Sequence, residues 1–432
     1  MPKKIEIGKT NFSDLYQILK LESVEALDSK KARLFPSGNS ENEVSTTSIF
    51  LASLSAIKEY REELFGEIGI SRLGARNAQL HAYTEVISDT KEDRPDGLLV
   101  ITSGKNTPII EWAGFVEAKV KDNHLDAEQV ERYSNFAREI GINDIITVSN
   151  QLSSNPKESP ISLKKRSFNL YHWSWTYLKV TGSRLIRTNK VEDEDHVYIL
   201  KELRRYFDNH KNLSGYVNMG KYWKDSVNAI HGYSSDQKIE FDLLNKITDS
   251  YIQEEKDISL QLTDRSQFHV ELVNSSKRRD EVEESLNSKK LITSEYMVDK
   301  VRKNTFTIEV DFIRQKVTCT TTVQIEKGKA KGQTSTLIKK FEDIGATSHI
   351  LINAVYLRNR SKGNNVPLSQ LIDERTQDVP YSVLEKSYGD TVKHFEIKTE
   401  DLLGRDFQSV KNFIVKLESS SKRFLEQVVA NK

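Results

Sequence analysis

The sequence is poor in several residue types, and each scarcity excludes a class of protein. A single cysteine, Cys319, occurs among 432 residues, which excludes an intramolecular disulfide and a cysteine-rich zinc module. No apolar run approaches the roughly 20 residues that span a bilayer, so we expect no membrane association. The start, Met1-Pro2-Lys3-Lys4, is not followed by the apolar stretch of a secretory signal. Together these features predict a cytoplasmic protein.

An excess of charge of one sign is also lacking. Lys and Arg number 64 and Asp and Glu number 63, so the formal net charge is only +1. This excludes a uniformly basic nucleic-acid binder, and any polyanion site must be a local patch. Hydrophobic residues make up 37% of the chain, which is enough for packed cores. At roughly 100–200 residues per domain, the length predicts two or three domains.

The first part of the chain switches from a helical pattern to strand patterns. Apolar residues near helical spacing predict a helix over 48–66, after a polar loop over 35–42. Alternating residues over 80–86 predict a strand, with Glu85 on the face opposite to Leu80 and Ala82. Strands are also predicted over 97–102 and 114–120, so the sheet is expected to begin antiparallel.

A second helix is predicted after these strands. Asp126 is a candidate N-cap, and Gln129 three residues later would complete a capping box. Gly141 marks the helix end, and strands are predicted over 144–148 and 167–173. The order is therefore helix, three strands, helix and two strands, which predicts a mixed sheet flanked by helices in an α/β (α+β) architecture.

The later part of the chain divides into two further segments. Helical patterns follow one another up to about residue 255, and β-branched and aromatic residues between 268 and 325 then predict a second, mostly antiparallel sheet. We therefore expect four parts: an N-terminal extension (1–45), an α/β domain (46–180), a helical connector (181–255) and a C-terminal α+β domain of unknown role (256–432).

One group of residues carries a specific chemistry. Asp96 begins a predicted strand, and Glu117 and Lys119 lie two positions apart on the next strand, so their side chains share a face. If the two strands pair, two carboxylates and one ammonium group converge at a sheet surface. Two carboxylates about 4 Å apart repel by roughly 4 kcal/mol at an effective dielectric constant near 20. One of them must then take a proton, or a cation must lie between them.

A hard divalent ion suits such a carboxylate pair. Mg²⁺ prefers oxygen ligands and keeps open positions for water and a phosphate oxygen, and Mn²⁺ is a natural substitute. The ion would orient the attacking water and offset charge that grows on the phosphate. Lys119 would orient the nucleophile and stabilise transition-state charge. The pattern therefore indicates metal-dependent hydrolysis of a phosphodiester.

These residues resemble the PD-(D/E)XK nuclease superfamily. Pro95-Asp96 is followed, 21 positions after Asp96, by Glu117-Ala118-Lys119, and the order of predicted elements is similar to the restriction-endonuclease-like core. Several branches also carry a Gln and a Tyr four residues apart on the next helix, as Gln129 and Tyr133 are. The resemblance covers residues 45–175. It implies that Asp96 and Glu117 are metal ligands and that Lys119 is catalytic. It also implies that Gln129 positions nucleic acid or the lysine, and that Tyr133 has a similar binding or positioning role.

Members of this superfamily often add an acidic residue from an earlier helix or strand. We favour Glu85 as this further metal ligand, because a lone charge in an apolar strand is costly unless it is paired or ligating. The alternatives lie on or just after the preceding predicted helix: Glu59, Glu62, Glu63 and Glu67.

Each of these residues also has a structural interpretation. Pro-Asp-Gly is ordinary turn chemistry, and Glu117 with Lys119 suits an ion pair on an exposed strand face. Gln129 suits helix capping, and Tyr133 suits core packing. Three basic clusters would contact a phosphate backbone if they lay around the site, but each also suits a solvated face: Lys164-Lys165-Arg166, Lys277-Arg278-Arg279 and Lys327-Gly328-Lys329-Ala330-Lys331-Gly332.

The sequence thus predicts a metal-dependent nuclease with nucleic acid as its partner, and a DNA endonuclease is favoured. A nuclease domain joined to a large second module is the layout of prokaryotic restriction and antiviral defence proteins, which is an analogy only. The alternatives are an RNA-cleaving enzyme, a non-catalytic nucleic-acid- or protein-binding protein that keeps the nuclease fold, and a structural partner in a multi-protein complex. The sequence does not decide whether the chain forms a homo-oligomer.

Overall fold

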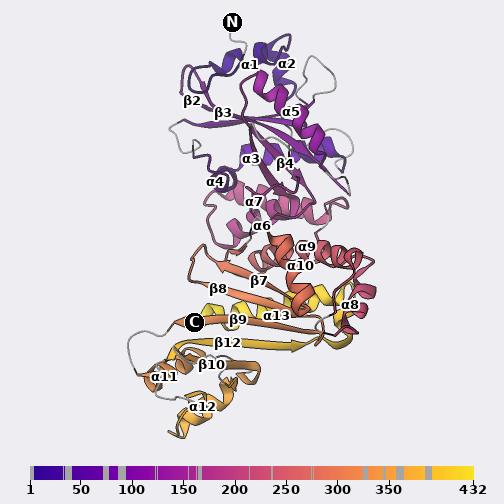
Figure 1. Cartoon of the computed structure of the whole chain (residues 1–432). Coiled ribbons are helices and arrows are strands. Elements are labelled where there is room, and N and C mark those ends of the chain that lie inside the picture. Colours follow the sequence, from indigo (N-terminus) through magenta and orange to yellow (C-terminus); the bar gives the residue numbers. More distant parts are fainter. Residues whose placement is uncertain are drawn as a thin grey trace. The chain divides into compact units, whose positions relative to one another are not determined.

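The chain forms two compact units, residues 1–215 and 216–432, which we call the N-terminal and C-terminal units (Figure 1). The structure is a computed structural model that describes residues 4–32, 34, 41–71, 77–85, 94–121, 123, 125–153, 155–161, 163, 168–213, 215–234, 237–273, 275, 277–324, 329–342, 344, 347–356, 364–384 and 392–432. No helix within these ranges is long and apolar enough to cross a membrane. The division between the units lies inside 181–255, the segment expected as a helical connector.

The N-terminal unit is built on a five-stranded sheet of order β1-β2-β3-β4-β5. The first three strands are antiparallel, as predicted, and β4 and β5 run parallel to β3. Its elements are α1 (Leu15–Ile18), α2 (Val24–Asp28), α3 (Glu43–Ala56), α4 (Lys58–Glu67), β1 (Gln79–Thr84), β2 (Gly97–Ser103), β3 (Ile109–Ala118), α5 (Ala127–Glu139), β4 (Asp144–Ser149), β5 (Asn169–Ser174), α6 (Trp175–Arg187) and α7 (Glu194–Asn209).

Helices cover both faces of this sheet (Figure 1). On one face, α5 packs Val130 and Ala137 into a core shared with Phe115 of β3. This core also receives Leu15 and Ile18, so the segment expected as an N-terminal extension is part of the fold. On the other face, aromatic residues of α3 and α4 meet the sheet edge-on: Phe50 against Trp173, and Phe65 against Trp112 and Trp173. Burial on both faces explains why β2 is a continuous apolar run.

The predicted helix over 48–66 is wrong in its bounds. The structure has two helices, because Ile57 is extended (φ −100°, ψ 104°) and separates α3 from α4. The first of them begins at Glu43, since the Asn42 side chain accepts a hydrogen bond from Ser45 N at 2.7 Å and caps the helix. This earlier start matters because it places an acidic residue in the first turn of α3. Of the expected loop over 35–42, residues 35–40 lie outside the described ranges.

The C-terminal unit contains the predicted second sheet, which is antiparallel throughout. Its order is β11-β10-β12-β9-β8-β7-β6, so the last strand of the chain lies in the middle of the sheet. Its elements are α8 (Trp223–His231), α9 (Phe241–Arg265), β6 (Val270–Leu272), α10 (Arg278–Lys289), β7 (Leu291–Val298), β8 (Thr305–Asp311), β9 (Lys316–Gln324), α11 (Ala330–Phe341), β10 (Ile350–Tyr356), β11 (Val366–Pro367), α12 (Leu368–Thr376), β12 (Val392–Leu402) and α13 (Asn412–Gln427).

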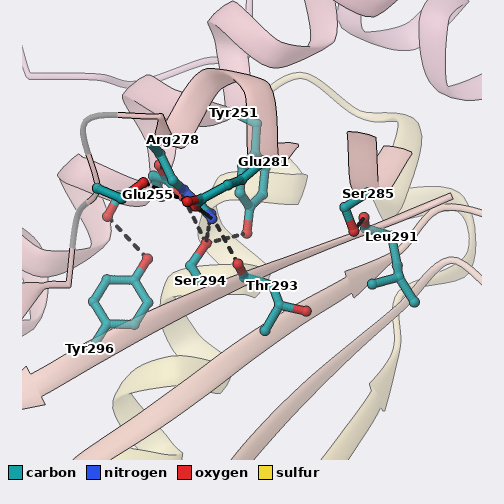
Figure 2. Close-up of polar contacts among 10 residues, drawn as sticks. Tyr251, Glu255, Arg278, Glu281, Ser285, Leu291, Thr293, Ser294 and Tyr296 are labelled. Carbon is teal, nitrogen blue, oxygen red and sulfur yellow. Dashed lines mark hydrogen bonds and ion pairs between the residues drawn. The ribbon is translucent and has the colours of Figure 1, made fainter. Parts of the chain in front are cut away.

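A buried polar network joins α9, α10 and β7 (Figure 2). The Glu255 side chain is 0% exposed, and Arg278 donates to its carboxylate from Nε (3.0 Å to Oε1) and Nη2 (2.5 Å to Oε2). Nη2 also donates to Thr293 O at 3.0 Å and Ser294 Oγ at 3.1 Å. Ser294 donates to the same carboxylate at 2.8 Å, and the Tyr296 hydroxyl donates to the Glu255 carbonyl oxygen at 3.0 Å. The buried charge is therefore both neutralised and hydrogen-bonded.

The basic cluster Lys277-Arg278-Arg279 is thus not a plain solvated face. The Arg278 side chain is only 15% exposed, because it reaches inward to Glu255. Its neighbour Arg279 stays at the surface and pairs with Asp249 at 2.5 Å and Glu283 at 2.9 Å. The cluster Lys164-Lys165-Arg166 and the first two residues of the third cluster lie outside the described ranges.

The neighbouring residue on α9, Glu254, has no such compensation. Its side chain is 0% exposed, and neither carboxylate oxygen accepts a hydrogen bond from any residue that the structure describes. Burial raises the pKa of Glu254 well above its usual 4.5, and the nearby charges of Asp257 and Glu418 raise it further. Burial therefore favours the protonated form of Glu254 in the folded protein.

Replacing Glu254 by methionine is expected to stabilise the protein increasingly as the pH rises. The unfolded chain releases the Glu254 proton near its usual pKa of 4.5, whereas the folded chain releases it only at a higher pH, because the pKa of Glu254 is raised. In the wild type, the free energy of unfolding is therefore unaffected by Glu254 below pH 4.5, and it falls as the pH rises towards the folded-state pKa of Glu254. At about pH 8, Glu254→Met should gain on the order of 1–3 kcal/mol, the usual cost of an unsatisfied buried polar group.

The measurement is the unfolding temperature of wild type and Glu254→Met between about pH 5 and pH 9. Glu284→Met serves as the control, because Glu284 is exposed on α10 of the same unit. Curves for wild type and Glu254→Met that run parallel over this range would show that Glu254 does not carry the proposed proton.

Candidate active site

The β2–β3 pair brings Asp96, Glu117 and Lys119 together. Gly97 pairs with Val116 across the two strands, so Asp96 lies beside the end of β3. One oxygen of Asp96, Oδ2, accepts a hydrogen bond from Ala118 N at 2.8 Å, which fixes its carboxylate against the β3 backbone. The Lys119 ammonium lies 2.5 Å from Glu117 Oε1. Both side chains therefore share a face, and Asp96 faces the same corner of the sheet.

The Glu117 carboxylate is buried and crowded. The residue is 1% exposed, and its Oε2 atom accepts no hydrogen bond from any described residue. Burial and the adjacent charge of Asp96 raise the pKa of Glu117 to about 8, although Lys119 opposes the shift. The pKa of Asp96 is also raised, mainly by burial. The pair therefore shows the behaviour expected of two close carboxylates without a cation between them.

Lys119 stays protonated among these acidic side chains. Burial alone would lower the pKa of Lys119, but the charge of Glu117 and its hydrogen bond outweigh burial and raise that pKa. Its side chain is 15% exposed, so Lys119 is not completely enclosed by the protein. An ammonium group that stays protonated can stabilise negative charge at the site throughout the physiological pH range.

Glu43, a residue that the sequence analysis did not single out, completes the cluster. Its Oε1 lies 3.4 Å from Lys119 Nζ, and its Oε2 accepts a hydrogen bond from Val120 N at 3.3 Å. A carboxylate in the first turn of a helix is favoured by the helix dipole. The signal was present in the sequence: Asn42 is a good N-cap residue, and Glu43 follows it directly.

The structure gives Glu85 a different partner from the one that its predicted role requires. Its backbone N–H donates to Asp96 O at 3.0 Å, so the residue does lie next to the site. Its carboxylate, however, forms an ion pair with Arg94 at the protein surface. Glu85 also has a positive φ of 55°, which ends the extended conformation of β1. Among the described residues, Glu43 rather than Glu85 contacts the lysine.

The alternative acids on α4 are engaged elsewhere. Glu59 lies 2.8 Å from His196 Nδ1 of α7, and Glu63 forms an ion pair with Arg184 of α6. Glu62 lies 3.9 Å from Lys58 on its own helix. The contacts of Glu59 and Glu63 fasten α4 to its neighbouring helices.

Gln129 and Tyr133 lie beside the acidic cluster. Gln129 Nε2 donates to the Tyr133 hydroxyl at 2.7 Å, and this hydroxyl donates to Arg94 O at 3.1 Å, two residues before Asp96. Burial, together with the charge of Glu117, raises the pKa of Tyr133 to about 12. Asp126 caps the helix through Glu128 N at 2.9 Å, while the Gln129 side chain bonds to Tyr133.

The carboxylates fit a divalent ion only with help from water. Within the described ranges, no three His, Cys, Asp or Glu side chains lie close enough together to enclose a metal ion. Mg²⁺ does not need such a cage, because it often binds through one or two carboxylates and keeps several waters. Asp96 and Glu117 would hold it, since Glu117 Oε2 is a buried oxygen that lacks a partner among the described residues.

Comparisons with protein-family models, curated proteins and solved structures found no match to this chain.

Proposed function

We propose that the N-terminal unit is a metal-dependent nuclease, and that its substrate is DNA. Two observations carry this proposal. Asp96, Glu117 and Lys119 lie together at the ends of β2 and β3, and the buried Oε2 of Glu117 accepts no hydrogen bond from any described residue. Buried acids with raised pKa values cluster at functional sites, and a cation between Asp96 and Glu117 would offset the repulsion between them.

A restriction-endonuclease-like fold is part of the proposal. Its support is the arrangement of elements: α3 and α4 precede the antiparallel β1-β2-β3 run, α5 follows, and β4 and β5 extend the sheet in parallel. This is the order on which the resemblance to the PD-(D/E)XK superfamily rests. The candidate site lies at the start of β2 and the end of β3, where that superfamily's motif falls.

The side chains at the site divide into three roles in this proposal. Asp96 and Glu117 would hold the metal ion, and this ion would supply an activated water and positive charge to offset that of the phosphate. Lys119 donates hydrogen bonds to the phosphate oxygen that gains charge, and Glu43 and Glu117 hold its ammonium group in place. Gln129 and Tyr133 border the site from α5 and would contact the nucleic acid.

The direct test is cleavage of plasmid DNA, linear DNA and RNA in the presence of Mg²⁺, Mn²⁺ or EDTA. Cleavage is expected only with a divalent ion, and Asp96→Asn should slow it on the order of 10²-fold or more, because the ion loses a charged ligand. Asp193→Asn is the matched control, since asparagine also caps helices and Asp193 is an exposed N-cap at the start of α7.

Each outcome discriminates between the candidate functions. Cleavage that persists in EDTA or in Asp96→Asn would exclude the metal mechanism. Cleavage of RNA alone would make the chain a ribonuclease with the same site. Nucleic-acid binding without cleavage would favour a non-catalytic protein that keeps the fold. Co-purification of a stoichiometric partner, with no cleavage by the isolated chain, would favour a structural role in a complex.

A further inference from the structure

The chain leaving β3 is held by hydrogen bonds from several distant segments. Lys119 N donates to Val148 O of β4 at 2.7 Å, and Lys119 O accepts from Trp175 Nε1 of α6 at 2.9 Å. The next N–H, of Val120, donates to Glu43 of α3 at 3.3 Å. The backbone on both sides of the lysine is therefore fixed by three other elements of the unit.

A fourth contact comes from the end of the N-terminal unit. Lys121 N donates to Asn212 O at 2.9 Å, and the side chain of Asn150 bridges the two segments. Asn150 Nδ2 donates to Lys121 O at 2.8 Å and to Asn212 O at 2.9 Å, so both of its N–H groups are used. Lys121 has a positive φ of 62°, an uncommon conformation for a lysine that these bonds maintain.

The 210–212 segment also reaches the helix that carries Glu43. Asn212 Nδ2 donates to Glu41 O at 3.1 Å, and His210 Nε2 lies 2.9 Å from Thr46 Oγ1. Because His210 Nδ1 accepts the N–H of Asn212 at 3.1 Å, its Nε2 carries the proton and donates to Thr46. One short segment thus contacts both the chain that follows Lys119 and the start of α3.

We propose that Asn150 and the 210–212 segment are positioning elements. They hold the side chains of Lys119 and Glu43 in their positions relative to each other. The expected effect on DNA cleavage rests on the proposed function, whereas the hydrogen bonds described above do not. Within the described part of the chain, the side-chain hydrogen bonds of Asn150 go to Lys121 O and Asn212 O and not to Asp96, Glu117, Lys119 or Glu43. Asn150 acts by fixing the turn at Lys121, and the 210–212 segment acts by tying that turn to α3.

The test replaces Asn150 by aspartate or alanine in the full chain. Aspartate has the same shape but cannot donate, so both bridging hydrogen bonds are lost and its charge faces two carbonyl oxygens. Since a displacement of about 1 Å can cost 10²-fold in rate, kcat for DNA cleavage should fall roughly 10- to 100-fold while KM changes little. Asn169→Ala is the control, because it removes one side-chain hydrogen bond at the far end of the same sheet.

A second readout does not depend on catalysis. Hydrogen exchange at residues 119–121 should accelerate in Asn150→Asp, whereas exchange in β2 should stay as in wild type. Unchanged exchange, or kcat equal to that of wild type, would overturn the positioning role. If wild type fails to cleave any substrate, the proposed function fails and the exchange result alone decides this inference.

A third variant tests the proposal even if the Asn150 variants do not fold. Thr46→Val removes the hydroxyl that His210 contacts while keeping the side-chain shape. It therefore weakens the attachment of the 210–212 segment to α3 without changing Asn150. It should lower kcat in the same manner and accelerate exchange at 119–121. If the Asn150 variants do not fold, Thr46→Val with wild-type behaviour on both readouts would refute the proposal.

Discussion

Lys119→Ala is expected to lower kcat for metal-dependent DNA cleavage about 10²- to 10³-fold, the usual effect of removing one preorganised donor to a charged transition state. The ammonium group lies 2.5 Å from Glu117 and keeps its charge at all physiological pH values, since its pKa is raised. No other described lysine or arginine forms an ion pair with Glu117 or Glu43, so no neighbouring cation replaces it. Single-turnover cleavage of plasmid DNA measures the chemical step directly.

The fold should survive this substitution. Without Lys119, the Glu117 carboxyl can take a proton, because its pKa is already raised to about 8. Lys179→Ala is the matched control: Lys179 is also a partly buried lysine in an ion pair, but with Asp208 at 3.2 Å on α7. Glu43→Gln should cause a smaller loss than Lys119→Ala, since Glu43 only orients the ammonium group. Wild-type rates for Lys119→Ala would remove the proposed role of the lysine.

Arg278→Met is expected to destabilise the C-terminal unit by about 3–5 kcal/mol, the cost of leaving a buried charge without its partner. The Glu255 carboxylate is 0% exposed and accepts hydrogen bonds from Arg278 at two of its nitrogen atoms (Figure 2). Ser294 would remain as a donor, but its hydroxyl carries no charge to compensate the carboxylate. Urea denaturation followed by circular dichroism measures the free energy of unfolding.

Two comparisons make this prediction specific. Arg279→Met removes the adjacent arginine, whose ion pairs are surface-exposed, and should cost at most about 1 kcal/mol. The double variant Arg278→Met with Glu255→Met should recover much of the loss, because removing both charges leaves none uncompensated. Equal destabilisation by the two single arginine variants would contradict a special role for the buried pair.

Local patterns in the sequence predicted much of the N-terminal unit. The alternation from Leu80 to Thr84 and the apolar run from Leu98 to Ile101 gave strands in the right order, because a buried sheet requires such residues. The antiparallel C-terminal sheet was also predicted from composition. One of its inner strands, β12, was missed although Phe395, Ile397 and Thr399 alternate with polar residues, since Lys and Glu side chains lie on the other face.

The candidate site was predictable as far as it depends on two paired strands. The spacing of Asp96, Glu117 and Lys119 identifies a shared sheet face, and pairing then brings the residues together. Glu43 lies 76 residues before Lys119, and no local pattern shows that the start of α3 meets the end of β3. The partner of Glu85 could not be predicted either, because its positive φ is a property of the folded chain.

The other features that the sequence did not predict are polar contacts between residues far apart in the chain. The basic triplet at 277–279 suggests three exposed cations, yet Arg278 is drawn inward by Glu255, which is 23 residues away and on another helix. Asn150 and Asn212 are 62 residues apart and carry no motif. Such pairs become visible only when the elements that carry them are packed.

The contacts of residues 210–212 set how long a fragment must be for the candidate catalytic cluster to keep the contacts described above. A fragment that stops at residue 180, the boundary suggested by the sequence, would still contain every candidate catalytic side chain. It would lack α7 and residues 210–212, and with them the acceptor for Lys121 N and the partner of Thr46. A fragment that continues to residue 215 retains both, so nuclease assays on a truncated protein should begin from that longer version.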